Sequence, residues 1–299
     1  MTRRGWLLFS MMAVLWGIPY LLIRVAVRQL DPGVVVLGRT APAALLLLPV
    51  VLHQKSWNAL VTNIKWIAVF GVAEFGVPWY LMSTAERHIT SSLTSLIICA
   101  VPLFSVIASR FTSAHEPIGP RRLLGLGAGA GGVALLVGLD LKGGSITWIV
   151  FMLIVGVGYS IGPLILATKL RDVPGPAVVC GATGLVALAW VPYDVFHWPV
   201  RVDAETWMSM GILSVFCTAG AFLTFFALVK EAGSNRSVVV VYSNTAIAVV
   251  LGIVGLHEPF TVGIAVGFPL IVIGSYLATS VRTIARDHAG GDANLTLHD

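Results

Sequence analysis

The chain alternates between long apolar stretches and short polar connections. Ten apolar stretches follow one another, near residues 6–27, 33–52, 65–84, 89–109, 121–139, 146–168, 174–196, 206–229, 235–256 and 260–281. A helix of about 20 apolar residues crosses the ~30 Å hydrocarbon core of a bilayer. Turn-forming residues such as Asp31-Pro32-Gly33 separate the stretches. The pattern predicts an all-α membrane protein with ten transmembrane helices.

The second half of the chain repeats the first. The tripeptide His-Glu-Pro occurs at residues 115–117 and again 142 positions later, at residues 257–259. The same offset aligns two further pairs of glycines, Gly125 with Gly267 and Gly132 with Gly274. A constant offset over about 50 residues indicates an internal duplication. We therefore divide the chain into three parts, a first five-helix repeat (1–142), a second five-helix repeat (143–284) and a polar cytoplasmic tail (285–299) that we expect to be disordered.

An odd number of helices in each repeat makes the two repeats enter the membrane in opposite directions. Basic residues set the orientation, because cytoplasmic loops are enriched in Lys and Arg. With the N-terminus inside, 13 Lys and Arg fall on the cytoplasmic side and four on the other, while Arg24 and Arg39 fall within stretches. We expect a multi-pass protein of a bacterial-type cell membrane, with both termini cytoplasmic.

Composition excludes several classes of protein. Hydrophobic residues make up 57% of the chain and charged residues 11%, against about 25% charged in ordinary soluble domains. The net charge of +5 follows from membrane orientation and gives little support to nucleic-acid binding. The three cysteines lie in apolar stretches, without the spacing of metal ligands or disulfides. We expect neither a cofactor nor a metal.

Two prolines lie at matching depth in the first and sixth helices and predict helix kinks. Pro19 follows Trp16 and precedes Tyr20, and Pro163 follows Tyr159. A proline removes one backbone donor and frees a carbonyl one turn earlier, which a substrate or water can use. Broken helices at corresponding places are the best sequence pointer to a transporter's binding site. A packing kink is the alternative reading of both prolines.

Two charged residues lie deep within predicted helices. Arg39 is six residues into the second helix, and Glu74 is ten residues before the outer end of the third. Charges inside a bilayer are costly, about 2.5–3.5 kcal/mol each, and usually face protein or water. We interpret Arg39 as structural or substrate-facing, and Glu74 as its counter-ion or as a proton-coupling carboxylate. A buried ion pair without a role in transport remains the alternative.

Further polar and aromatic residues are candidates for lining a cavity. Trp16 and Trp79 lie deeper than the tryptophans at the stretch ends, and Tyr20 and Tyr159 supply an aromatic wall with a polar tip. Tyr242 and Asn244 lie within the ninth stretch. Glu116 and Glu258 precede the last helix of each repeat, where a carboxylate binds unpaired N–H groups. We assign these two glutamates a structural role at helix starts.

The order of these features resembles the EamA type of the drug/metabolite transporter superfamily over nearly the whole chain. The features are Trp16-Gly17, Arg39, Pro102 in the fourth helix and the two Glu-Pro steps, each before a Gly-rich stretch. The resemblance implies a ten-helix secondary transporter, commonly an exporter of amino acids or other small metabolites. It also implies that Pro102 lies near the cavity. Asn244 occupies the position where the family often keeps a second proline, so we expect a weaker break in the ninth helix.

Three functions remain to be compared. The first is a secondary transporter for small metabolites by alternating access, with protons as a candidate coupling ion, since the chain has no phosphate-binding GK[ST] loop. The second is a flippase that moves lipids or other amphiphiles through a groove between the repeats. The third is a membrane enzyme, which we reject because Gly158-Tyr159-Ser160-Ile161-Gly162 lacks the strand-turn-helix context and a histidine at matching depth. The sequence indicates no oligomeric state.

The inverted arrangement predicts opposite exposure of the two Glu-Pro corners. Cysteines placed at His115 and His257, in a variant without the native cysteines, should react with membrane-impermeant thiol reagents from opposite faces of oriented vesicles. Labelling of both positions from the same face would contradict the inverted topology.

Overall fold

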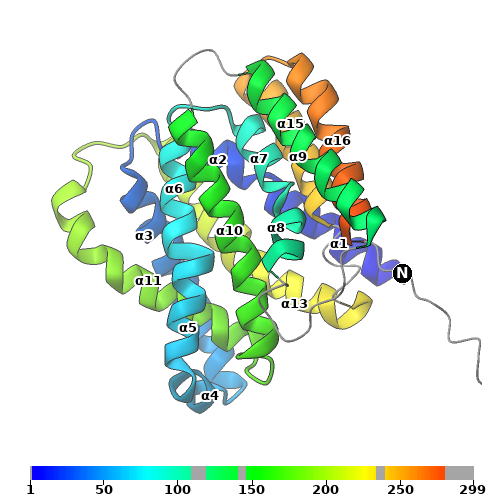
Figure 1. The fold of residues 1–299 in the computed structure, drawn as a ribbon. Helices are drawn as coiled ribbons and strands as arrows, with labels where there is room; N and C mark the ends of the chain where they lie inside the picture. Colours follow the sequence, from blue (N-terminus) through cyan, green and yellow to red (C-terminus); the bar gives the residue numbers. More distant parts are fainter. Residues whose placement is uncertain (1, 109–118, 141–145, 234–239, 280–299) are drawn as a thin grey trace, which may run out of the picture.

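The computed structural model describes residues 2–108, 119–140, 146–233 and 240–279, and within these ranges every regular element is helical (Figure 1). The first repeat contains α1 Arg3–Gly17, α2 Pro19–Ala26, α3 Pro32–His53, α4 Trp57–Thr62, α5 Ile64–Gly71, η1 Val72–Gly76, α6 Val77–Ala85, α7 Ser91–Ile98, α8 Val101–Ala108 and α9 Pro120–Asp140. The second contains α10 Ile146–Thr168, α11 Gly175–His197, α12 Ala204–Ser214, η3 Val215–Gly220, α13 Ala221–Ala232, α15 Val240–Leu256 and α16 Val262–Thr279. The predicted tail (285–299) and Glu116 lie outside the described residues.

The helices follow the ten predicted apolar stretches. Six continuous helical segments of 22 to 29 residues are long and apolar enough to cross a bilayer, and four shorter apolar helices accompany them. The short helix α4 was not predicted, because it lies in a polar connection. The prediction of an all-α membrane protein is confirmed.

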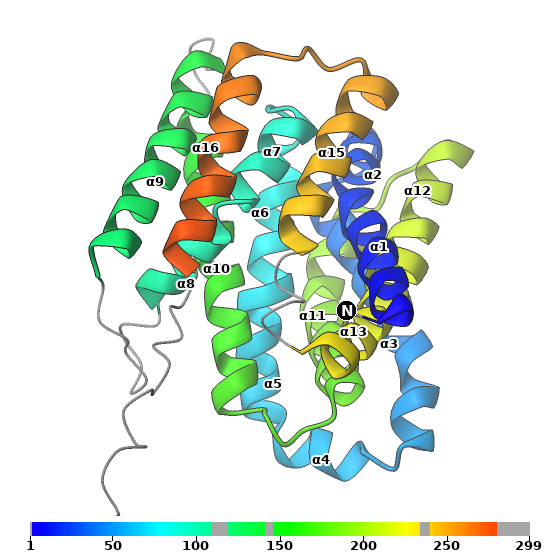
Figure 2. The same ribbon diagram turned by 90° about the vertical axis from the view of Figure 1, so that its right-hand side faces the viewer.

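Corresponding helices of the two repeats pack against each other in antiparallel pairs. In α9 and α16, Gly132 lies against Ile271, whereas Gly129 lies against Gly274, so one helix runs up as the other runs down (Figure 2). Small residues let helix backbones approach closely in a membrane. A Cβ atom on Gly274 would lie 2.7 Å from the carbonyl oxygen of Gly125. This pairing confirms the inverted relation of the repeats.

Two further pairs of corresponding helices have the same arrangement. The pair α3 and α11 brings Gly33 to Asp194 at one end, and Cys180 Sγ lies 3.5 Å from the Ala44 carbonyl oxygen further along. The pair α7 and α15 brings Ser92 to Gly252. The most extensive contacts between the described helices therefore join the two repeats rather than lie within either one.

Only one of the two predicted proline breaks interrupts a helix. Pro19 starts α2 after Ile18, and its missing N–H leaves the Leu15 carbonyl one turn earlier without that donor, whereas α10 runs through Pro163 without a break. The kinks predicted at the two prolines stay a prediction. Proline inside a membrane helix is tolerated where neighbouring groups satisfy the freed carbonyl.

The matching irregularities are instead π-helical turns in the third helix of each repeat. Turn η1 lies between α5 and α6, and η3 lies between α12 and α13, at corresponding positions of the repeats. Pro78 cannot donate to the carbonyl of Glu74 one turn earlier, which loosens the ladder at η1. At η3 the Thr218 hydroxyl donates to the Leu213 carbonyl oxygen at 2.8 Å, five residues back. Side-chain insertion of this kind is a known cause of helix irregularity.

The fourth helices of the two repeats differ as the sequence predicted. The chain is interrupted at Cys99-Ala100, between α7 and α8 and just before Pro102. At the corresponding position of the second repeat, α15 continues as one helix through Asn244. Replacement of proline by asparagine explains the difference, because asparagine retains its backbone donor.

The glycine contact between α9 and α16 predicts a stability defect. Gly274→Ala should lower the free energy of unfolding by about 1–3 kcal/mol, because the added methyl group overlaps the backbone of α9. Thermal unfolding in detergent measures the change. Gly131→Ala is the matched control, since no atom lies within 4 Å of its Cβ position; equal stability of the two variants would contradict the close packing.

Candidate functional site

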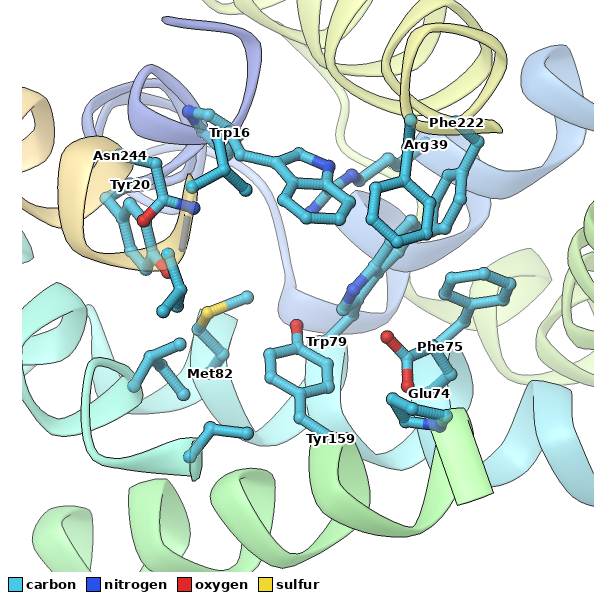
Figure 3. Close-up of a pocket in the computed structure, with 17 residues that line it drawn as sticks. Trp16, Tyr20, Arg39, Glu74, Phe75, Trp79, Met82, Tyr159, Phe222 and Asn244 are labelled. Atoms are coloured by element: carbon cyan, nitrogen blue, oxygen red, sulfur yellow. The ribbon is translucent and has the colours of Figure 1, made fainter. Parts of the chain in front are cut away.

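A cavity of about 230 Å³ lies at the centre of the molecule, between helices of both repeats (Figure 3). Its wall comes from α1, α2, α3, η1, α6, α7 and α8 of the first repeat and from α10, α13 and α15 of the second. Seven of the nine predicted cavity residues line it, namely Trp16, Tyr20, Arg39, Glu74, Trp79, Tyr159 and Asn244. Pro19 and Pro163 also line it. Pro102 and Tyr242 are not among the lining residues.

Arg39 is held in place by three contacts with its surroundings. Its side chain is buried, and Nε donates to the Thr218 hydroxyl at 2.9 Å. The guanidinium carbon lies 3.5 Å from the centre of the Trp79 ring, a cation–π arrangement. The Ser214 hydroxyl donates to the Arg39 carbonyl oxygen at 3.1 Å. Since Nε supplies one of five N–H donors, the guanidinium keeps further donors for an anionic group in the cavity.

Glu74 reaches the cavity from the π-helical turn η1. Its Oε2 atom is buried and has no hydrogen-bond partner. Gly162 of α10 makes room for the carboxylate, because a Cβ atom there would overlap Oε2. A carboxylate oxygen buried without a donor is costly to keep charged, and protonation or a bound cation removes that cost.

The two charged residues do not form an ion pair with each other. Among the described residues, the ion pairs within 4.0 Å join Arg87 with Asp31 and Arg171 with Asp172. Arg39 uses Thr218 and Trp79 instead, so Glu74 is left without a counter-ion. The cavity therefore contains a cation and an acidic group that are separately available to a ligand.

Aromatic rings form much of the apolar wall of the cavity, and the sequence analysis missed eight of the residues that line it. Phe75 lies 4.9 Å from Trp79 and 5.4 Å from Phe222, between ring centres. Phe225 lies 5.2 Å from Trp16. Figure 3 places Trp16, Tyr20 and Asn244 across the cavity from Glu74 and Phe75. The missed residues are Phe75, Met82, Ile98, Val101, Phe222, Phe225, Val240 and Val241. The available signal was a Phe next to Glu74 and two Phe in the third helix of the second repeat.

Glu258 binds a helix start, but not that of its own helix. Its carboxylate accepts from the backbone N–H groups of Ser91 and Ser92 at 2.7 and 3.0 Å, and from their hydroxyls at 3.0 and 2.6 Å. These residues begin α7 of the other repeat. The expectation that Glu258 binds the start of α16 was wrong, because His257 has a φ of 56° that turns the chain back toward α7. We call this contact the Glu258 latch.

Glu86 is a buried carboxylate close to the latch that the sequence analysis did not single out. It follows α6 directly, just beyond the end of a predicted apolar stretch, where a charge is expected to meet water. The side chain is 0% exposed, and neither carboxylate oxygen has a hydrogen-bond partner. Arg24 donates to the Glu86 carbonyl oxygen.

The described residues contain no group of three or more His, Cys, Asp or Glu side chains placed to hold a metal ion. Cys99, Cys180 and Cys217 are buried free thiols. The side chains that line the cavity offer charge, hydrogen bonding and aromatic contact to a ligand.

Comparison with known proteins agrees with this architecture. The EamA-like transporter family matches residues 3–138 and again residues 146–280. An uncharacterized transporter of Archaeoglobus fulgidus is 22% identical and covers 93% of this chain and 100% of its own length. The uncharacterized transporter YvbV of Bacillus subtilis is 25% identical over 89% of this chain and 88% of its own. A solved crystal structure with 17% identity has a TM-score of 0.66 over 92% of this chain and 96% of its own, which shows a shared fold.

The two family matches together cover nearly all of the chain, and the apolar helices make it an integral membrane protein. The chain belongs to the EamA-like transporter family, within the drug/metabolite transporter superfamily.

Proposed function

We propose that the protein is a secondary transporter that exports small amphipathic metabolites, amino acids among them, by alternating access. The observation that carries the proposal is the central cavity, which both repeats line and which contains Arg39 and a Glu74 whose Oε2 atom has no hydrogen-bond partner. A transporter built from inverted repeats places its substrate at the interface between them. The cavity lies at such an interface.

The side chains of the cavity fit a substrate with separated charges. A carboxylate can accept from the free donors of Arg39, and an ammonium group can bind the Glu74 oxygen that has no partner. An apolar side chain would pack on Trp16 and Phe222. A cavity of about 230 Å³ holds roughly eight waters at about 30 Å³ each, a volume that suits a small metabolite.

Glu74 supplies a physical basis for coupling to protons. A proton and a substrate ammonium group would stabilise the same buried carboxylate, so binding of one disfavours binding of the other. Exchange of the two at Glu74 would then drive substrate movement with a proton gradient. The corresponding residue of the second repeat is Phe216, so the first repeat carries this role alone.

The alternative of a lipid flippase has less support. A groove between α5, η1 and α6 on one side and α10 on the other does lie between the repeats. Its lining side chains are all apolar: Ala68, Val69, Val72, Ala73, Val77, Pro78, Ile154, Val157, Gly158 and Ile161. Such a groove suits an acyl chain, but these residues offer no polar group to a lipid headgroup.

Counterflow in proteoliposomes tests the proposed substrate class. Vesicles loaded with unlabelled amino acids should accumulate the labelled compound when it is a substrate. Arg39→Ala should weaken binding about tenfold or more, because a hydrogen bond to a charged group contributes about 1.5–3 kcal/mol. Arg171→Ala, an exposed arginine, is the control. Scrambling of a labelled lipid without exchange of any soluble metabolite would refute the exporter proposal.

Removal of the Glu74 charge should separate exchange from coupling. Glu74→Gln should still exchange substrate in counterflow, with weaker binding because a neutral amide cannot pair with the substrate ammonium group. It should lose net flux driven by an imposed pH gradient, since the amide cannot bind a proton in this range. Glu205→Gln, at an exposed position of α12, should behave as the wild type. Unchanged gradient-driven flux in Glu74→Gln would remove Glu74 from the coupling role.

A second variant changes the space around the Glu74 carboxylate and leaves Glu74 itself unaltered. Gly162→Ala should displace the carboxylate and reduce gradient-driven flux, because the new methyl group overlaps Oε2. Gly184→Ala is the matched control, since the nearest atom to its Cβ position is 3.8 Å away.

A further inference from the structure

Glu86 and Glu258 lie near each other at one end of the molecule but in opposite environments. This end, where α2, α6 and α15 finish and α7 begins, is called the latch end. Glu258 accepts four hydrogen bonds, two of them from backbone N–H groups at the start of α7. Glu86 accepts none and has no exposed surface. Donors at a helix start stabilise a charged carboxylate, whereas burial without donors favours the protonated form.

Arg24 does not provide the Glu86 carboxylate with a hydrogen-bond or ion-pair partner. Its guanidinium donates to the backbone carbonyl oxygen of Glu86, and no ion pair within 4.0 Å joins it to the carboxylate. Burial raises the pKa of the Glu86 carboxyl, the charge of Arg24 lowers it, Glu258 raises it and Arg39 lowers it, in decreasing order of effect. Tyr20 of α2 and Tyr159 of α10 are the other titratable groups that interact with Glu86.

The position of Glu86 connects the cavity with the latch. Glu86 directly follows α6, which carries Trp79 and Met82 into the cavity. Ser91, which donates to Glu258, follows Glu86 by five residues. The latch joins α7 of the first repeat to the corner between α15 and α16 of the second. A movement that separates the start of α7 from the corner between α15 and α16 must break these four hydrogen bonds and would admit water to Glu86.

We propose that Glu86 is a proton-binding residue of the transport cycle, protonated beneath the closed Glu258 latch and deprotonated when the latch opens. On opening, the proton passes from the Glu86 carboxyl to water, and the Arg24 guanidinium is left to balance the new charge. On closing, Glu86 must take up a proton before it is buried again. The role in a cycle rests on the proposed transport function, whereas the protonation state and its link to the latch do not.

Infrared spectroscopy of the full-length protein in lipid nanodiscs tests the protonation state without a substrate. The wild type should absorb in the carbonyl stretch of protonated carboxylic acids near neutral pH, and Glu86→Gln should lose part of that band. Glu205→Gln, exposed on α12, should keep it. A Glu86→Gln spectrum identical to that of the wild type would overturn the proposal. Should Glu86→Gln fail to fold, Glu86→Asp must shift the band of protonated carboxylic acids. An unshifted band in Glu86→Asp would also overturn the proposal.

Weakening the latch tests the connection to Glu258. The double variant Ser91→Ala, Ser92→Ala removes two of the four donors but keeps the backbone N–H groups. Water should then reach Glu86 more often, and its band should titrate at a pH lower by about one unit, which is a tenfold change in proton affinity. A titration that is unchanged in the double variant would overturn the link between the latch and Glu86.

The transport measurements distinguish this proposal from that on Glu74. Glu86→Gln should retain counterflow of a labelled amino acid and slow gradient-driven net flux about tenfold. Full gradient-driven flux in Glu86→Gln would overturn the role of Glu86 in the cycle, whatever Glu74→Gln does. Failure of every soluble metabolite to exchange would refute the exporter proposal and leave the infrared result standing.

Discussion

A backbone group that leaves the helical ladder inside a bilayer needs another partner, and this constraint decides where the site can lie. The chain meets it with π-helical turns at corresponding positions of the third helix in each repeat. One turn carries Glu74 into the cavity, and the other presents Thr218, whose hydroxyl donates to Leu213 and accepts from Arg39. The duplicated irregularity thus holds both charges of the site, although the residues that it presents differ between repeats.

The cavity depends equally on the way in which the repeats interlock. Antiparallel pairs such as α9 with α16 and α3 with α11 are each formed from both repeats. A movement that changes access to the cavity therefore involves groups of helices drawn from both repeats. The Glu258 latch belongs to the same pattern, because a corner of one repeat binds a helix start of the other.

The sequence predicted the fold well because the helix pattern and the repeat are local or periodic signals. Ten apolar stretches and a constant offset suffice for ten helices in two inverted repeats. The depth of Arg39 and Glu74 also indicated the cavity, since charges within a membrane helix rarely face lipid. The sequence could not predict that Arg39 and Glu74 do not form an ion pair. Arg39 binds Thr218 instead, which lies 179 residues away in the chain.

Other parts of the site depend on tertiary contacts that no local pattern records. The left-handed turn at His257 sends Glu258 to α7 rather than to the helix that follows it. Glu86 resembles a loop residue in the sequence, yet the neighbouring helix ends bury it completely. The sequence predicts a kink at both Pro19 and Pro163. In the structure Pro19 starts a new helix, whereas α10 continues through Pro163, and the residues around the two prolines do not record this difference.

The interlocked repeats also bear on how the protein is made. Synthesis delivers the first repeat to the membrane before the second exists, so α3, α7 and α9 wait in the bilayer without their main partners. Until α16 arrives, lipid tails must occupy the glycine-lined face of α9, and Ser91 and Ser92 must bind water or headgroups. The main helix contacts of the first repeat therefore form only after α11, α15 and α16 have entered the membrane.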